Sequence, residues 1–271
     1  MTLPPLEQLV ERFLAFTRDF LDETGPDLAN IRLKIDHSLR VLDMAREITA
    51  QESITGPARD LALAAALLHD TGRFPQYARY RTFSDRDSEN HAVLGVRTLH
   101  QGLGNGAEEG LLAGFSRRAA GIVLGAVRLH NLLALGDGLK EPLSTVARVV
   151  RDSDKLDILP VLKGHLTGQG PDNKVVTLGV APHPTAYSQA MLDTVLARQN
   201  ADYRSMRHTN DFKLLAISWV YGLEFPATAR LMREQGHLDG LLDSLPQDRN
   251  MDRLRLQIRD DLDKLCRSVH V

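Results

Sequence analysis

The chain has 271 residues, of which 43% are hydrophobic and 25% are charged, so it could form one large or two small globular domains of ordinary composition. Its net charge of -2, with no basic block, gives no support to a nucleic-acid groove or a membrane-surface role. The single cysteine, Cys266, excludes an internal disulfide and a thiolate metal cluster. Residues Met1 to Pro5 lack a basic region followed by an apolar run, and no apolar stretch reaches the roughly 20 residues of a membrane span. We therefore expect a cytoplasmic protein without a signal peptide.

Apolar residues recur at helical spacing through the first half of the chain. They predict a helix over about 6–20, stopped by Thr24-Gly25-Pro26, and a second helix over about 30–51. A third helix is expected from Gly56-Pro57, where proline suits the first turn, to His69-Asp70. The remaining expectations for this half are a loop at 71–88, a helix from Ser88 or Asn90, a glycine-rich loop at 101–115, a helix from Ser116, a turn at 135–138 and a helix from Glu141.

The second half begins with a stretch rich in glycine and proline, residues 164–185. Around Lys174 to Leu178 this stretch predicts either a short β-hairpin or an extended excursion. Helical spacing then resumes at about 184–200, 211–221, 226–235 and 247–269. The pattern favours a single all-helical domain with a C-terminal helical extension.

Six side chains with metal-binding groups lie at the ends or on the inward faces of these expected helices: His37, His69, Asp70, His91, His130 and Asp154. Imidazole nitrogens and carboxylate oxygens are ligands for borderline-hard divalent metals. A lone histidine on an apolar helix face is more often an ordinary hydrogen-bonded residue, so only the set as a whole indicates a metal site. Asp154 is preferred to Asp152 because it follows Val146 and Val150 at steps of four.

The order of these residues, His … His-Asp … Asp, resembles the HD superfamily of metal-dependent phosphohydrolases over about residues 30–160. Residues 151–157, Arg-Asp-Ser-Asp-Lys-Leu-Asp, are similar to the Asp-Ala-Asp-Lys/Arg-Leu-Asp run of bacterial HD proteins. The extra histidines, His91 and His130, resemble the two-metal branch, which includes the HD-GYP phosphodiesterases. The Gly-Tyr-Pro segment and the second histidine after His130 are absent, and Asn131 stands there instead. The resemblance therefore does not extend to the hydrolysis of cyclic dinucleotides.

This resemblance implies an all-α HD-domain helical bundle, with the core at about 30–160 and the helical extension at about 184–271. It also implies two divalent metal ions, drawn from Fe, Mn, Zn, Co, Ni and Mg. The first would be held by His37, His69, Asp70 and Asp154, and the second by His91 and His130, with Asp70 bridging the two. Ions about 3.5–4 Å apart can clamp a phosphate and lower the pKa of a bound water.

Residues 73–81 contain three arginines and three aromatic side chains, which could contact phosphate oxygens and stack on a base. They could equally form a solvated loop that its aromatic residues anchor to the core. Arg73, three residues after Asp70, is the expected phosphate contact. Lys155 could neutralise charge on the phosphoryl group or form a surface ion pair, and Asp36 could orient a ligand imidazole or face solvent.

The leading hypothesis is a divalent-metal-dependent phosphohydrolase in which Asp70, Arg73 and Lys155 take part in catalysis. It would cleave a phosphomonoester or phosphodiester of a nucleotide or a small metabolite, by attack of metal-bound hydroxide. Its partner would be that small phosphorylated substrate, with neither nucleic acid nor membrane expected, and the tail from Tyr187 could serve a homo-oligomer. Two rivals stay open: an HD-like di-iron oxygenase, which shares the ligand order, and a non-catalytic nucleotide-binding sensor or scaffold.

Overall fold

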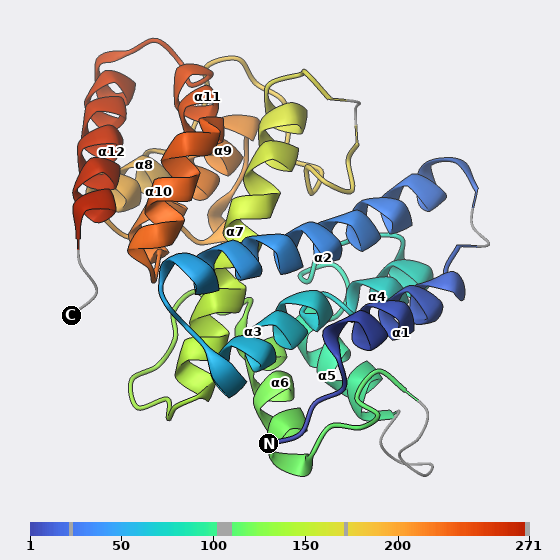
Figure 1. Cartoon of the computed structure of the whole chain (residues 1–271). Coiled ribbons are helices and arrows are strands. Elements are labelled where there is room, and N and C mark those ends of the chain that lie inside the picture. The colour runs from blue at the N-terminus through green and yellow to red at the C-terminus, as the bar shows by residue number, and fades with distance from the viewer. Residues whose placement is uncertain (22–23, 102–109, 171–172, 269–271) are drawn as a thin grey trace. The chain divides into compact units, whose positions relative to one another are not determined.

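The structure, a computed structural model, describes residues 1–21, 24–101, 110–170 and 173–268. In these ranges the chain is all-α, as predicted (Figure 1). The one β-type pairing in the described ranges is an isolated parallel bridge between Ala181 and His208. The chain folds into two compact units, Met1–Asp154 and Lys155–Val271, and helix α7 (Leu143–Leu166) passes from the first into the second. None of the described helices combines the length and the apolar character that crossing a membrane requires.

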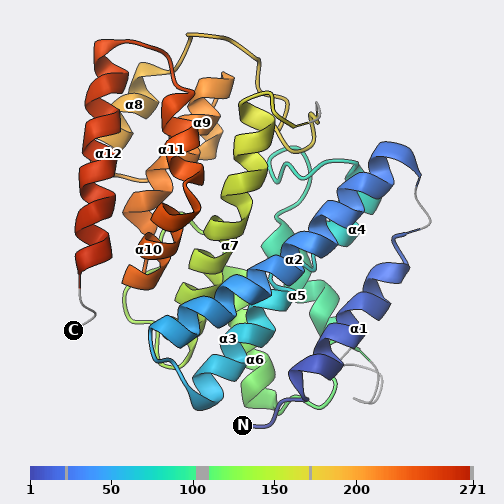
Figure 2. The ribbon, with the colours of Figure 1, turned by 45° about the horizontal axis from the view of Figure 1, so that its top comes forward.

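The first unit is built around α3, the most deeply buried of its helices. Every residue from Leu61 to Leu68 is buried, because this run of alanine and leucine is apolar on all sides. Helix α3 packs against α1, α2 and α6, and it lies next to α2 in both views (Figures 1 and 2). The helices of this unit before α7 are α1 (Leu6–Arg18), α2 (Gly25–Gln51), α3 (Gly56–Leu68), α4 (Arg73–Tyr80), α5 (His91–Gln101) and α6 (Arg117–Leu129).

Helix α2 starts five residues earlier than the apolar spacing predicts, because Pro26 occupies its first turn, where a missing N–H costs nothing. The starts of α5 and α6 agree closely with the predictions, and Ser116 caps α6 by accepting a hydrogen bond from the backbone N–H of Ala119. Most of the predicted loop at 101–115 falls on residues 102–109, which lie outside the described residues.

A close approach between two backbone segments explains Gly72. A Cβ atom there would lie 2.1 Å from the carbonyl oxygen of His91 and 2.4 Å from the backbone nitrogen of Gly95. Only glycine allows the turn after α3 to lie directly on α5. This contact brings His91 beside His69 and Asp70, so it fixes the relation between three of the six candidate ligands.

The prediction of a loop throughout 71–88 is wrong, because α4 occupies its first half. Two aromatic side chains one turn apart, Phe74 and Tyr77, are both buried and give this short helix an apolar face. The ring of Phe74 lies 5.9 Å from that of Phe13 and 5.7 Å from that of Phe16, both on α1. The charged composition of the segment therefore concealed a helix that is anchored by its aromatic residues. Residues after Arg81 are irregular up to α5, as predicted.

The second unit contains a further set of short helices. These are α8 (Gln189–Leu196), η1 (Tyr203–Ser205), α9 (Thr209–Ser218), η2 (Trp219–Gly222), α10 (Pro226–Gln235), α11 (His237–Asp243) and α12 (Arg249–Arg267). Helix α10 packs against α11 and α12, and the three lie side by side in both views (Figures 1 and 2). Helix α11 was not predicted. The hairpin alternative at Lys174 to Leu178 is wrong: these residues form turns in which the N–H groups of Val176 and Thr177 both bond to the carbonyl of Asn173.

Candidate metal centre

All six predicted ligands converge at one place in the first unit. His37 comes from α2, His69 and Asp70 follow α3, and His91 opens α5. His130 ends α6, and Asp154 lies on α7. The first five are buried, whereas the carboxylate side chain of Asp154 is 30% exposed. The cluster is therefore largely buried, and Asp154 is its partly exposed member.

Four of these residues form a first group. The Nε2 atom of His37 lies 3.2 Å from Nε2 of His69, 3.2 Å from Oδ1 of Asp154 and 3.5 Å from Oδ2 of Asp70. The Nε2 atom of His69 lies 3.7 Å from Oδ1 of Asp154 and 3.8 Å from Oδ2 of Asp70. Each of these two imidazole nitrogens thus lies within 3.8 Å of one carboxylate oxygen from Asp70 and one from Asp154.

The remaining two histidines face the other oxygen of Asp70. Oδ1 of Asp70 lies 3.5 Å from Nε2 of His91 and 3.8 Å from Nε2 of His130. Asp70 therefore stands between the two groups, with one oxygen directed to each. His69, His130 and Asp154 also offer ligand atoms within 4.8 Å of one another, so the two groups are contiguous.

The hydrogen bonds of the rings fix which nitrogen carries the proton. Nδ1 of His69 lies 2.7 Å from the carbonyl of Ala66, and Nδ1 of His130 lies 2.7 Å from the carbonyl of Val127. Because a carbonyl only accepts, each Nδ1 must be the donor, and each Nε2 keeps its lone pair when the ring is neutral. Both histidines end a helix, and each bonds to the carbonyl three residues earlier.

His91 is fixed in the same way by a side chain. Its Nδ1 donates to the carboxylate of Asp85, 2.7 Å away at Oδ2. Its Nε2 then presents a lone pair to the Nε2 lone pair of His130 at a distance of 2.9 Å. Two neutral imidazoles repel each other in this arrangement unless a cation lies between or beside the lone pairs. The donor set therefore fits a bound metal ion better than a hydrogen-bonded polar core.

The electrostatics of the site favour the ligand forms of these side chains. Burial alone would raise the pKa of Asp70, but Lys34, His69 and Arg73 together hold it well below its ordinary value. The carboxyl of Asp154 behaves in the same way, because hydrogen bonds from His37 and His69 outweigh burial and keep its pKa well below the usual range. Both carboxyl groups are thus ionised at neutral pH.

The pKa values of the histidines shift in different directions. Burial, followed by the positive charges of His91 and His69, lowers the pKa of His130 to about 3. Burial and the charge of Arg73 also lower the pKa of His91. Burial lowers that of His69 as well, but Asp70 and Asp154 outweigh it and raise the pKa above 6.5. His91 and His130 are therefore neutral at physiological pH, whereas a proton on His69 competes with a metal ion.

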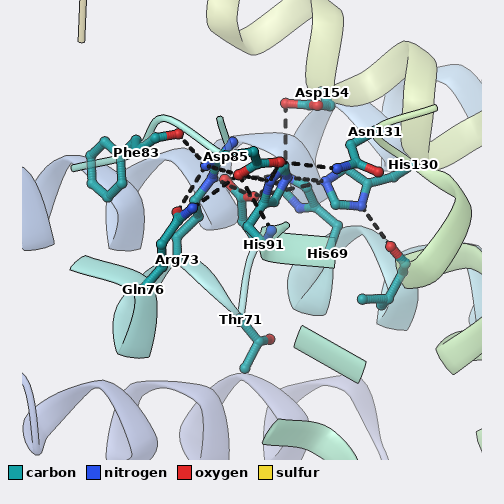
Figure 3. A network of polar contacts seen from close by, with 12 residues as sticks. His69, Thr71, Arg73, Gln76, Phe83, Asp85, His91, His130, Asn131 and Asp154 are labelled. Atoms are coloured by element: carbon teal, nitrogen blue, oxygen red, sulfur yellow. Dashed lines mark hydrogen bonds and ion pairs between the residues drawn. The ribbon is translucent and has the colours of Figure 1, made fainter. Parts of the chain in front are cut away.

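Asp85 is a site residue that the sequence did not reveal. Besides His91, its carboxylate accepts hydrogen bonds from Arg73 at 3.1 Å, Gln76 at 2.9 Å and Asn131 at 3.3 Å (Figure 3). It lies in irregular chain six residues before His91, beside another aspartate, Asp87, and no local pattern distinguishes the two. Asp85 fixes the ring of His91 and links it to the residue that follows His130.

Lys34 is the second residue that was missed. Its Nζ atom lies 2.7 Å from Oδ2 of Asp70, and its side chain is only 10% exposed. The signal was present, because Lys34 precedes His37 by one helical turn and shares its inward face.

Arg73, Lys155 and Asp36, which were predicted to act in catalysis or to orient a ligand, lie in three different surroundings. The guanidinium of Arg73 faces the centre, with Nε 3.4 Å from Oδ1 of Asp70, and its Nη1 is held by the carbonyl of Phe83 and by Asp85. The ammonium of Lys155 donates a hydrogen bond to the carbonyl of Gly222, within the second unit. Asp36 is exposed, as in the solvent-facing alternative. The catalytic roles of Arg73 and Lys155 stay predictions.

The comparison with protein families agrees with this geometry. The family model described as HD domain matches residues 35–159, a span that contains all six candidate ligands. This part of the chain belongs to the HD-domain superfamily. HD domains are typical of metal-dependent phosphohydrolases, and their helical bundle agrees with the fold described above. Comparisons with curated proteins and with solved structures gave no match.

Proposed function

We propose that this HD protein is a divalent-metal-dependent phosphohydrolase that cleaves a phosphomonoester or phosphodiester of a nucleotide or a small metabolite. The observation that carries the proposal is the pair of neutral imidazoles, His91 and His130, whose lone pairs face each other at 2.9 Å beside Asp70. HD-family membership connects such a centre with phosphoryl chemistry.

The six candidate ligands provide donors for two metal ions. His37, His69 and Asp154 would hold one ion together with Oδ2 of Asp70, and His91 and His130 would hold a second with Oδ1. Such ions, when bound, lower the pKa of a water molecule and neutralise charge on the phosphate. Closed structural zinc sites usually contain thiolate ligands, whereas the candidate ligands here are imidazoles and carboxylates, as is more typical of a catalytic site.

The chain's own groups would perform the remaining tasks. Arg73, held by Phe83 and Asp85, presents a fixed guanidinium edge to the same side of Asp70 as the second group. A rigid guanidinium orients a phosphate at little entropic cost. Asp154, at the exposed side of the centre, marks the side from which a substrate could enter.

The proposal is tested by measuring metal content and hydrolysis on the same protein. The full chain would be stripped, reloaded separately with Mn, Fe, Co, Ni, Zn or Mg, and assayed on p-nitrophenyl phosphate, bis(p-nitrophenyl) phosphate and a panel of nucleotides. We expect metal-dependent release of phosphate or alcohol, abolished in His69→Ala. The matched control is His100→Ala, because His100 is exposed near the end of α5 and outside the centre.

Two results would count against the proposal. A protein that binds none of these metals at micromolar concentration would remove its basis. Substrate-dependent oxygen uptake by the iron form, without hydrolysis by any form, would favour the di-iron oxygenase instead.

A further inference from the structure

The ammonium of Lys34 is a buried cation inside the candidate centre. Lysine is seldom buried, because removing its charge from water is costly unless a partner compensates. Here the partner is Oδ2 of Asp70, 2.7 Å away, and the ring of Phe83 lies below the ammonium at 5.2 Å from its centroid. Lys34 also lies one residue outside the span that matches the HD family model.

Arg73 forms the second half of the same arrangement. Its guanidinium approaches Asp70 from the Oδ1 side, and its carbon Cζ lies 5.8 Å from the centroid of the same Phe83 ring. Two cations therefore flank one carboxylate and share one aromatic support. Phe83 is itself buried, and its carbonyl accepts a hydrogen bond from Arg73, so the positions of the cations are well defined.

Both cations keep donors that described side chains do not use. An ammonium has three N–H groups, and among the described residues that of Lys34 donates one hydrogen bond, to Asp70. The Nε atom of Arg73 is buried and has no acceptor at hydrogen-bonding geometry within the described chain. Buried donors of this kind are normally satisfied. An anionic ligand that reaches both cations would satisfy them.

The charges of the site indicate which anion fits. Three ionised carboxylates, Asp70, Asp85 and Asp154, oppose the two cations Lys34 and Arg73, so the side chains carry one net negative charge. Two divalent ions would bring the centre to three positive charges, with the ligating histidines neutral. A hydroxide nucleophile, with its single negative charge, would reduce this total to two positive charges. A phosphomonoester, which is largely a dianion above a second pKa of about 6, balances them, whereas a phosphodiester monoanion does not.

We infer that Lys34 and Arg73 form an anion-binding subsite that selects phosphomonoester dianions over phosphodiester monoanions. This inference rests on the proposed function. Lys34 contributes one of the two excess charges, so its removal should weaken the preference for the dianion. A hydrogen bond to a charged group, lost at an enclosed site, corresponds to about a 10- to 100-fold change in binding.

The test compares two substrates with the same leaving group. The ratio of kcat/KM for p-nitrophenyl phosphate to that for bis(p-nitrophenyl) phosphate would be measured for the metal-loaded full chain, for Lys34→Gln and for Lys34→Arg. The matched control is Lys140→Gln, because Lys140 is exposed and lies outside the site. We expect Lys34→Gln to lower the ratio about 10-fold or more, with Lys34→Arg and the control close to the wild type.

Binding gives a second readout that does not depend on turnover. Calorimetry at pH 8 would compare inorganic phosphate, then mostly a dianion, with dimethyl phosphate, a monoanion, on the metal-loaded wild type. We expect inorganic phosphate to bind at least 10-fold more tightly, and this advantage to shrink in Lys34→Gln while its metal content stays at the wild-type level. The wild-type comparison holds even if the variant does not fold.

Three results would overturn the inference. The first is a wild type that prefers the diester or binds both anions equally. The second is an unchanged ratio in Lys34→Gln, and the third is a loss of metal in that variant, which would make Lys34 a support for Asp70 only. Hydrolysis of neither substrate would instead refute the proposed function, and the binding comparison would still decide the role of Lys34.

Discussion

Replacing Asp85 by asparagine should weaken the second metal site and leave the first intact. The carboxylate of Asp85 accepts the Nδ1 proton of His91 at 2.7 Å, which aims Nε2 at the centre and makes the ring a stronger donor. Of the three rings whose Nδ1 partners are known, only that of His91 is held by a carboxylate; those of His69 and His130 are held by backbone carbonyls. Asp85→Asn therefore acts selectively on one ion.

The size of the effect follows from the kind of contact that is lost. Removing an outer carboxylate from a ligand histidine typically costs about 10- to 100-fold in metal affinity, or about 1.4–2.7 kcal/mol. Asparagine keeps the shape and one oxygen for Gln76 and Arg73. Its amide NH2 would then face the Nδ1–H of His91, so the variant loses both the negative charge and an acceptor for that proton. Equilibrium dialysis with elemental analysis would measure both ions, with the exposed neighbour Asp87→Asn as the control.

The expected outcome is two ions in the wild type and in the control, and one tightly bound ion in Asp85→Asn. The second ion should return at a 10- to 100-fold higher metal concentration. Equal weakening of both ions, or no weakening, would refute the reasoning that the Asp85 carboxylate supports only the subsite containing His91.

Two further predictions concern pH and packing. The metal-free protein should unfold at a lower temperature at pH 5 than at pH 7.5. Folding lowers the pKa of His130 from 6.5 to about 3, so its contribution to stability is present above pH 6.5 and is lost as the pH falls toward 3. The lowered pKa of His91 acts in the same direction, and the raised pKa of His69 acts in the opposite one. A flat or inverted dependence in thermal melts would contradict this assignment. Gly72→Ala should destabilise the protein by about 1–3 kcal/mol or more and lower its metal content, because the added Cβ would lie 2.1 Å from the backbone of α5. The control is Gly121→Ala on α6, where the added Cβ would have nothing within 4 Å. This variant should be neutral or stabilise the protein by up to about 1 kcal/mol. Equal melting temperatures for the two variants would show that the approach at Gly72 relaxes freely.

The sequence was most informative where periodicity and chemistry coincide. The predicted all-α fold class is confirmed. It could be predicted because long apolar stripes specify helices whatever their tertiary partners. The six candidate ligands lie together as the motif order predicts, since each stands at a helix end or on an inward face. Their role as ligands stays a prediction.

Features that depend on tertiary contacts were not predictable. Helix α4 contains a proline and lies in a segment rich in polar residues, and only the packing of Phe74 against Phe13 and Phe16 shows why it is helical. Asp85 lies in irregular chain, so its approach to His91 depends on the path of the segment between α4 and α5. Lys34 could have been found, because a lysine on the buried face of a helix is uncommon and indicates a partner.

The most direct test of the central claim is the number and spacing of the metal ions in the reconstituted full-length protein. Elemental analysis, combined with a crystal structure or X-ray absorption at the metal edge, should show two ions per chain, about 3.5–4 Å apart, with Asp70 between them. A single ion held by His37, His69 and Asp154 alone, or ions bound away from these residues, would contradict it.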